Sequence, residues 1–281
     1  MKDSNTLKNQ VIAMSNILAK KSTRFSVTQQ KLFYASLASL KYGVNERNEV
    51  RINKQELFNL LGMESDNNRW SRLRKELRQL AENSYIEYGE DKEFKDGFLI
   101  YSFDSNRDRS YIFIRFNDDY LPLIKGLSNN FVRFLDDDLV TLKSKYSMML
   151  YQNLMKDKWK MSNIDFMGID YSTTQLKNMF GLSKESYMNR DGFFNRADFE
   201  RNTLNKAIKE LNEKCKCINN LKYEKIKKNG RVQYYKFSFD YTDPQSVADE
   251  SNERKGKSII DSMQKQSEEF SEEIKNLNWW D

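Results

Sequence analysis

The chain has 281 residues, of which 38% are hydrophobic and 31% are charged, and its formal net charge is +6. The length favours two domains of ordinary size, and the basic charge indicates either an anionic partner or a contribution to solubility. The sequence contains no histidine, which excludes nucleophilic triads that need an imidazole and metal sites with histidine ligands.

The N-terminal segment, MKDSNTLKNQVIAMSNILAKK, is too polar for a signal peptide. No apolar run in the sequence approaches the ~18 residues of a membrane-spanning helix. We therefore expect a cytoplasmic protein without a membrane partner.

The first half of the chain has the pattern of a winged helix. Ser26 or Thr28 is a suitable N-cap for its first helix. Asn53 is the N-cap of the next, and Gly62 ends that helix because glycine tolerates a positive φ. The expected elements are, in order, a helix at 26–42, a strand at Val50–Ile52, helices at 54–61 and about Asn68–Glu82, and strands at Tyr85–Tyr88, Phe98–Phe103 and Tyr111–Phe116.

The second half repeats this order. The stretch RINKQELFNLLGM at 51–63 returns as DYSTTQLKNMFGL at 170–182, with a constant offset of 119. An apolar helix at Leu139–Lys158 precedes it, with three aspartates at its positive N-terminal end. A helix at 197–214 follows, and its apolar positions match those of the helix at about Asn68–Glu82 at an offset of 131. The turn before it therefore holds 12 more residues than the same turn of the first copy. A hairpin around Asn229-Gly230 then completes the copy, because this dipeptide is a strong turn signal.

The sequence therefore predicts an α+β protein of two tandem winged-helix domains related by internal duplication, followed by an acidic tail. The expected boundaries are 1–125, 126–243 and 244–281. The tail is polar and rich in serine and glutamate, so we expect it to be flexible, with a short helix near 259–277. It ends in Trp279-Trp280, to which the pattern assigns no role.

The helix at 197–214 of the second copy has the side chains of a DNA-reading helix. Leu204, Ala207, Ile208 and Leu211 take its core side. Arginine and asparagine can make bidentate contacts to guanine and adenine edges, and lysines suit phosphates. The candidate DNA-binding residues here are Arg196, Arg201, Asn202, Asn205, Lys206 and Lys209, and those of the following hairpin are Lys225, Lys227, Lys228 and Arg231. The alternative for the helix alone is an ordinary solvated polar face.

The corresponding helix of the first copy is rich in arginine, which suits contacts to the DNA backbone better than base reading. Its candidate residues are Arg69, Arg72, Arg74, Lys75 and Arg78. The hairpin that follows is apolar on both faces. One face must pack on its own helices, and the other is expected to form a dimer interface or to be covered by the second domain.

Cys215 and Cys217 lie between the second reading helix and its hairpin. Two cysteines in one Cys-X-Cys cannot form a disulfide framework or a four-ligand zinc site. We expect both to be buried structural residues in a reducing compartment, because free cysteine behaves as a small hydrophobic side chain.

Three segments resemble the replication initiators of iteron-containing plasmids. They are SNILAKKSTRFSVTQQKLFYASLASL at 15–40, DLVTLKSKYSMMLYQNLMKDK at 138–158, and DYSTTQLKNMFGL at 170–182. The resemblance covers roughly residues 9–241 and leaves out the acidic tail. It is spread over helices and does not rest on invariant catalytic residues.

This resemblance implies that the chain binds direct repeats (iterons) at a plasmid origin in bacterial cytoplasm. Monomers would open the duplex with host factors and recruit the replicative helicase, while dimers formed through the first domain would repress the gene at an inverted repeat. The second domain would make most base contacts, through Arg201–Lys209, with Arg69–Arg78 in an auxiliary role. Two other functions fit the fold: a transcriptional repressor without an initiation role, and a protein–protein adaptor.

An enzymatic function is not expected, because the sequence shows no acid–base or metal constellation. Rolling-circle initiators need histidine ligands for a metal, which this chain cannot supply. We therefore expect no cofactor and no metal. Such an initiator would act through binding energy and DNA distortion.

Overall fold

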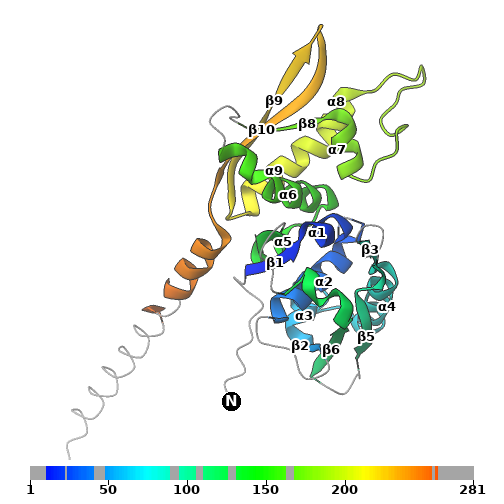
Figure 1. Cartoon of the computed structure of the whole chain (residues 1–281), viewed down its shortest axis with the longest axis vertical. Coiled ribbons are helices and arrows are strands. Elements are labelled where there is room, and N and C mark those ends of the chain that lie inside the picture. Colours follow the sequence, from blue (N-terminus) through cyan, green and yellow to red (C-terminus); the bar gives the residue numbers. More distant parts are fainter. Residues whose placement is uncertain are drawn as a thin grey trace, which may run out of the picture.

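The computed structural model describes residues 11–22, 24–40, 48–88, 95–105, 110–125, 131–162, 168–254 and 257–258. Two units of similar topology are stacked end to end, and a hairpin extends from the second unit away from the first (Figure 1). Both contain three helices and a three-stranded antiparallel sheet. The predicted tandem winged-helix fold is confirmed.

The first winged helix consists of α2 (Val27–Ser39), β2 (Glu49–Asn53), α3 (Lys54–Leu61), α4 (Arg69–Asn83), β5 (Ile100–Asp104) and β6 (Tyr111–Phe116). Its sheet has the order β2-β6-β5, so the strand before α3 pairs with the last strand of the hairpin. Ser26 is the N-cap of α2, and it forms a capping box with Gln29.

The second winged helix has the same order. It consists of α6 (Lys145–Asp157), β8 (Ile169–Ser172), α7 (Thr173–Met179), α8 (Arg196–Phe199), the π-helical turn η5 (Glu200–Leu204), α9 (Asn205–Lys214), β9 (Ile218–Lys228) and β10 (Arg231–Tyr241). The sheet order β8-β10-β9 matches β2-β6-β5 strand for strand.

The repeated sequence stretch forms the same capped helix twice. Asn53 and Ser172 are the N-caps of α3 and α7. Gly62 and Gly181 follow these helices with φ of 65° and 63°, in the left-handed region that favours glycine. The N–H groups of both glycines bond to the carbonyl oxygen three residues earlier, and those of the next residues bond five residues back. The offset of 119 is therefore a structural equivalence as well as a sequence one.

The remaining elements lie outside the two winged-helix units. They are β1 (Val11–Ser15), α1 (Asn16–Ser22), β3 (Tyr85–Tyr88), β4 (Lys95–Phe98), η3 (Asp118–Leu123), β7 (Phe131–Leu135), α5 (Asp136–Thr141) and η4 (Lys158–Ser162). Strand β1 pairs with β7, and β3 pairs with β4.

Two of the predicted elements are divided. The helix expected at Leu139–Lys158 breaks at Leu142, which is extended and fully buried, and restarts with Ser144 as the N-cap of α6. The strand expected at Phe98–Phe103 breaks at Leu99, because β4 pairs with β3 while β5 pairs with β6. In both places a buried leucine lies at the break, where the chain leaves one element and begins the next.

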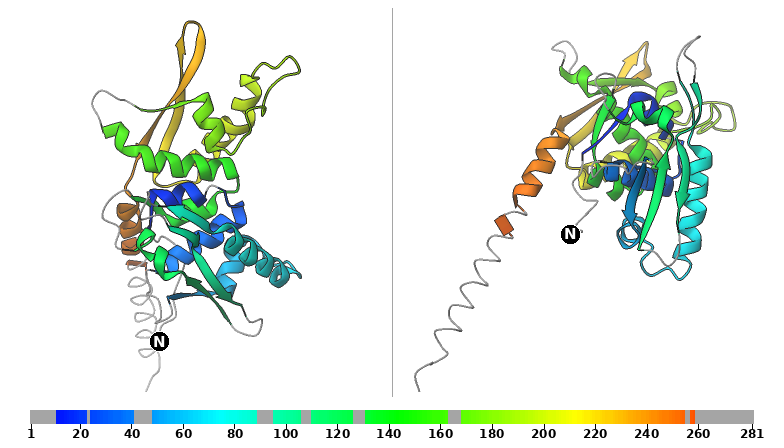
Figure 2. Two further views of the ribbon diagram at one scale, coloured as in Figure 1. Left: turned by 45° about the vertical axis from the view of Figure 1, so that its right-hand side comes forward. Right: turned by 60° about the horizontal axis from the view of Figure 1, so that its bottom comes forward.

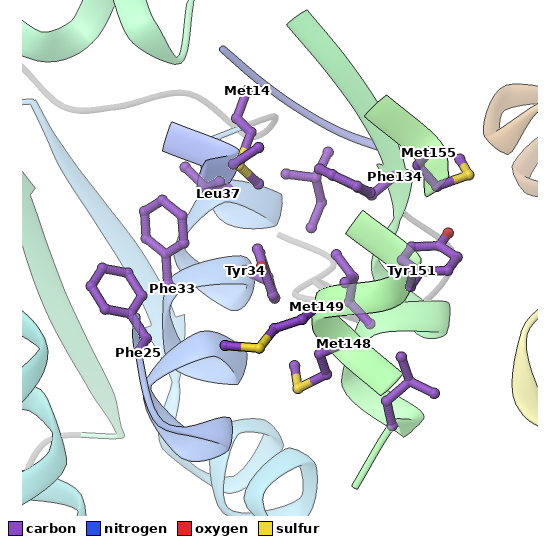
Figure 3. Packing of buried hydrophobic residues seen from close by; sticks show 14 of the residues in the cluster. Met14, Phe25, Phe33, Tyr34, Leu37, Phe134, Met148, Met149, Tyr151 and Met155 are labelled. Carbon is purple, nitrogen blue, oxygen red and sulfur yellow. The ribbon is translucent and has the colours of Figure 1, made fainter. Parts of the chain in front are cut away.

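One hydrophobic core runs through the junction of the two units. Figure 3 shows Met149 of α6 extending toward Tyr34 of α2, with Phe134 of β7 beside Tyr151. A buried polar network crosses the same junction: the Gln152 amide donates to Gln30 at 3.0 Å and to the Tyr34 hydroxyl. Helix α6 also packs on α9, so it contacts elements of both units.

The expected boundary at residue 125 stays a prediction. Strand β7 and helices α5 and α6 come after it, but they pair with β1 or contact α2 in the first unit. In the tail, residues 244–254 are helical, and Ala248 is buried. The helix expected near 259–277 and the terminal Trp279-Trp280 lie outside the described residues.

Candidate nucleic-acid interface

The reading helix comprises the continuous helical segment α8, η5 and α9, from Arg196 to Lys214. Leu204, Ala207 and Leu211 are fully buried against the second domain, while Ile208 is half-buried. The opposite side is exposed at Arg201, Asn205, Lys206 and Lys209, and Asn202 is half-buried. The helix thus has the two faces that its spacing predicts.

Two side chains of the exposed face are held by neighbours. Arg201 forms an ion pair with Asp198, one turn earlier. The amide oxygen of Asn205 accepts a hydrogen bond from the Tyr223 hydroxyl of β9 at 3.0 Å. This second contact fixes the asparagine beside the wing, at the middle of the exposed face. A fixed amide costs less entropy when it meets a base edge than a freely rotating one.

The wing consists of β9, β10 and the two-residue turn between them. Asn229 and Gly230 have φ of 52° and 75°, as a tight hairpin turn of this kind requires. Lys227, Lys228 and Arg231 surround the turn and are exposed. These three cations lie at the far end of the hairpin, beside its turn.

Glu200 joins the reading helix to the wing. Its buried carboxylate accepts hydrogen bonds from the Lys225 ammonium at 2.7 Å and from the Tyr235 hydroxyl at 2.9 Å. Burial and then the hydrogen bond to Glu200 raise the pKa of Tyr235. Arg196 donates to the same hydroxyl at 3.3 Å and to the Val232 carbonyl at 3.4 Å.

Two candidate DNA-binding residues have partners within the chain. Lys225 bonds to Glu200, and Arg196 bonds to Tyr235 and Val232 of β10. Their contact with DNA stays a prediction. Sequence reasoning gave Glu200 no role, because its partners lie 25 and 35 residues later in the hairpin. The available sequence signal was a glutamate in a helix that precedes a lysine-rich hairpin.

The segment before the reading helix, where the second copy holds its extra residues, leads directly into α8. Tyr187 and Phe194 pack their rings on Phe199, and Met188 bridges to Phe194. Asn195 is the N-cap of α8, accepting from the Asp198 N–H at 3.1 Å. The reading helix therefore begins at Arg196, one residue before the expected start.

The arginine-rich helix of the first domain is α4. Arg74, Lys75 and Arg78 are exposed, with Arg72 next to them in an ion pair with Asp66. Arg69 lies over the Phe58 ring at 4.9 Å, and it donates to the Glu64 carbonyl at 2.8 Å. Helix α4 and the start of the reading helix lie on the same side of the molecule in Figure 1 and in both views of Figure 2.

Cys215 and Cys217 are buried, as expected. Burial raises the pKa of both thiols, and the nearby Asp138 carboxylate raises them further, so they remain protonated. Asp138 accepts the N–H groups of Lys216 and Cys217 at 2.7 and 3.0 Å and the Tyr151 hydroxyl at 2.9 Å. The segment that contains the two cysteines is thus anchored to α5 and α6.

The apolar hairpin of the first domain has one buried and one open face. Ile112, Ile114 and Phe116 are buried on the helices. On the other face Tyr101 is 67% exposed, with the Arg115 guanidinium 4.8 Å from its ring centroid.

The helices that the structure describes include no candidate for a membrane span, because none combines the necessary length with sufficient apolar character.

Comparisons with known proteins agree with this architecture. The family model described as "Initiator Replication protein, WH1" matches residues 11–155, and the one described as "Initiator Rep protein, WH2" matches residues 172–239. No curated protein sequence matches the chain significantly.

Among solved structures, the Pi initiator protein in complex with iteron DNA is similar, with a TM-score of 0.64 and 21% identity over 84% of this chain and 99% of that one. Two structures of domains 2 and 3 of RctB have TM-scores of 0.41 and 0.40 and identities of 10% and 11%, over 81% and 84% of this chain and 85% and 87% of those chains. The likeness to Pi supports the tandem winged-helix fold.

Proposed function

The chain belongs to the initiator replication protein family, and from this premise we propose that it starts plasmid replication by binding repeated DNA elements at the origin. The observation that carries the proposal is the pairing of two cationic surfaces in one domain. The exposed face of the reading helix and the exposed tip of the wing belong to the same winged helix, and Glu200 fixes one against the other.

In this function the reading helix enters the major groove, whose width of ~12 Å admits one helix. Arg201 and Asn205 read base edges, and Lys206 and Lys209 contact phosphates. The wing tip holds the adjacent backbone through Lys227, Lys228 and Arg231. Helix α4 places Arg74, Lys75 and Arg78 on the DNA backbone of a neighbouring segment.

Direct repeats are the proposed target because the Pi initiator, which shares this fold, was solved with iteron DNA. A chain with two winged helices can occupy two successive major grooves, which lengthens the sequence read by one monomer. The chain acts by binding and DNA distortion, not by catalysis, and it passes the opened origin to the host replicative helicase and host initiator. Its location is then the bacterial cytoplasm, where the plasmid lies.

Homodimers are proposed to form through the open face of the β2-β6-β5 sheet. Tyr101 is exposed there, and Tyr111 and Phe113 are half-buried. Exposed aromatic side chains flanked by arginines are typical of protein interfaces. Sedimentation of the wild type and of Tyr101→Glu checks this: the variant should stay monomeric at concentrations at which the wild type dimerises.

The function is tested by footprinting on the DNA that surrounds the gene. Protection of several direct repeats beside an AT-rich segment, with permanganate-reactive thymines in that segment, is the expected result. Protection of a single promoter palindrome would identify a repressor without an initiation role. Weak, salt-insensitive DNA binding would instead point to a protein–protein adaptor.

A further inference from the structure

A groove of about 720 Å³ opens at the junction of the two winged helices. Its walls are the end of α1 from the first unit and helices α6 and α7 from the second. Five cationic side chains line it: Lys20, Arg24, Lys145, Lys156 and Lys160. The amides of Asn153, Gln175 and Asn178 add neutral hydrogen-bonding groups. Within the described part of the chain, neither the reading helix nor the wing contributes to this groove.

Little negative charge balances these cations. Of the described residues that line the groove, Asp157 is the one carboxylate. It accepts a hydrogen bond from the Tyr171 hydroxyl at 2.8 Å and lies 3.3 Å from the Lys160 ammonium. The lining therefore keeps an excess of positive charge, which favours an anionic ligand.

The basic surface continues on the other side of α1. A second hollow, of about 400 Å³, is lined by Lys20, Lys21 and Arg24 together with β3, the strand that follows α4, which adds the carboxylate of Glu87. Burial, and then the charge of Arg24, lower the pKa of Lys21. The end of α1 thus connects the arginine-rich helix of the first domain to the groove beside α7.

We propose that this interdomain groove binds the phosphodiester backbone of the duplex segment between the two sites occupied by α4 and the reading helix. The inference rests on the proposed function, since it presupposes that both helices face DNA. When two helices of one chain enter successive major grooves, the backbone that separates those grooves crosses the surface between the helices. That surface includes the α1–α6–α7 junction, and α8 and α4 lie on one side of the molecule, above and below it (Figure 1).

The chemistry of the lining suits this ligand. Lysine and arginine neutralise phosphates, and side-chain amides donate to phosphate oxygens without reading sequence. The cations come from both domains, so the bound backbone also fixes the position of one winged helix against the other. A single small anion would use one or two of these side chains, whereas a backbone segment uses the length of the groove.

The test uses one cation from each domain in the full-length chain. Arg24→Gln and Lys156→Gln are made singly and together, with Lys222→Gln, an exposed lysine of β9 outside the groove, as the matched control. Circular dichroism and the melting temperature establish that all variants fold. Binding to the origin repeats is measured from 50 to 300 mM salt, with ethylation interference on the same DNA.

The double variant should lose roughly 3- to 10-fold in affinity at low salt, and the slope of log K against log salt should fall by about 0.9 for each phosphate that the variant no longer neutralises. Interfering ethylations between the two major-groove tracts should disappear, while those within the tracts remain. Lys222→Gln should behave as the wild type. Unchanged slopes and an unchanged ethylation pattern in the double variant overturn the inference.

Two further outcomes separate this inference from the proposed function. If the wild type fails to bind the repeats at all, the proposed function fails first. If the groove variants bind DNA normally but no longer bind a fluorescein-labelled poly-glutamate peptide that the wild type retains, the groove belongs to an acidic protein segment and the DNA inference is wrong.

Discussion

The carboxylate of Glu200 and the ammonium of Lys225 form an ion pair at 2.7 Å that joins the start of the reading helix to the middle of the wing. The Tyr235 hydroxyl donates to the same carboxylate. A winged helix contacts DNA at two places, so the angle between helix and hairpin decides whether both can bind at once. In this chain that angle is set by a largely buried carboxylate with two partners from the hairpin.

The ion pair predicts different results for two neighbouring lysines. Lys225→Met should lower the free energy of unfolding by about 1–3 kcal/mol, because it leaves the Glu200 charge without its cation in a mostly buried position. The salt slope of DNA binding should not change. Lys227→Met, nearer the turn on the same strand, should reduce the slope and leave stability unchanged. A reduced salt slope in Lys225→Met would show that this lysine contacts phosphate, as the sequence pattern alone suggests.

The exposed face of the reading helix predicts a loss of sequence preference. Asn205→Ala and Arg201→Ala should each reduce discrimination against mismatched repeats by about 1–3 kcal/mol, the range for one bidentate base contact. Competition between an origin repeat and single-base variants measures this. Glu213→Gln, near the end of the same helix, serves as the control. Equal losses on origin and random DNA would assign both residues to backbone contacts instead.

The cations at the wing tip predict a loss of affinity without a loss of sequence preference. Lys227→Ala with Lys228→Ala should weaken binding to every sequence alike, and the salt slope should fall by about 0.9 for each phosphate that is left without its lysine. Titrations with specific and random DNA at several salt concentrations check this. A loss confined to the origin repeat would mean that the wing reads bases.

The equivalent glycines Gly62 and Gly181 predict equal losses of stability when either is replaced by alanine. Gly62→Ala and Gly181→Ala should each cost about 1–2 kcal/mol of stability, because an alanine in the left-handed region has its Cβ too near the following carbonyl. A Cβ at either position meets no other atom within 4 Å, so backbone conformation is the whole cause. Urea denaturation measures the loss. Gly62→Asn and Gly181→Asn are the controls and should recover part of it, since asparagine tolerates this conformation.

Local signals account for what the sequence could predict, and long-range contacts account for what it could not. Asn53, Gly62, Ser172 and the Asn229-Gly230 turn were all predictable, since the residues that cap or turn a segment lie within it. The fold class followed from the order of such segments. The exposed face of the reading helix followed from spacing alone.

The role of Glu200 was not predictable, because its partners Lys225 and Tyr235 come 25 and 35 residues later. The break before α6 was missed for the same reason: the carboxylate that accepts the N–H groups of Lys143 and Ser144 is that of Glu210, more than 60 residues away. The basic groove brings together α1 and α7, which the sequence separates by 150 residues, so no local pattern indicated it.

Glu210 predicts a pH dependence of stability. Burial alone would raise the pKa of this carboxyl, but hydrogen bonds, including those from the Lys214 ammonium and from the N–H groups of Lys143 and Ser144, lower it to about 2. Because the pKa in the folded chain lies below the ordinary value of 4.5, the ionised group stabilises the fold above pH 4.5. That contribution is lost as the pH falls from 4.5 toward 2.

Glu210→Gln should therefore lower the free energy of unfolding by about 1–2 kcal/mol at pH 7, less than the full pKa shift implies because solvent screens a part-exposed carboxylate. The difference from the wild type should shrink below pH 4.5 and vanish only below pH 2, where the wild-type carboxyl is also mostly neutral. Urea denaturation at several pH values measures this. Glu213→Gln is the control, because its partner Lys209 lies 3.8 Å away and both side chains are exposed. A difference that stays constant down to pH 2.5 would show that the glutamate stabilises the α6–α9 contact by its shape and hydrogen bonds, not by its charge.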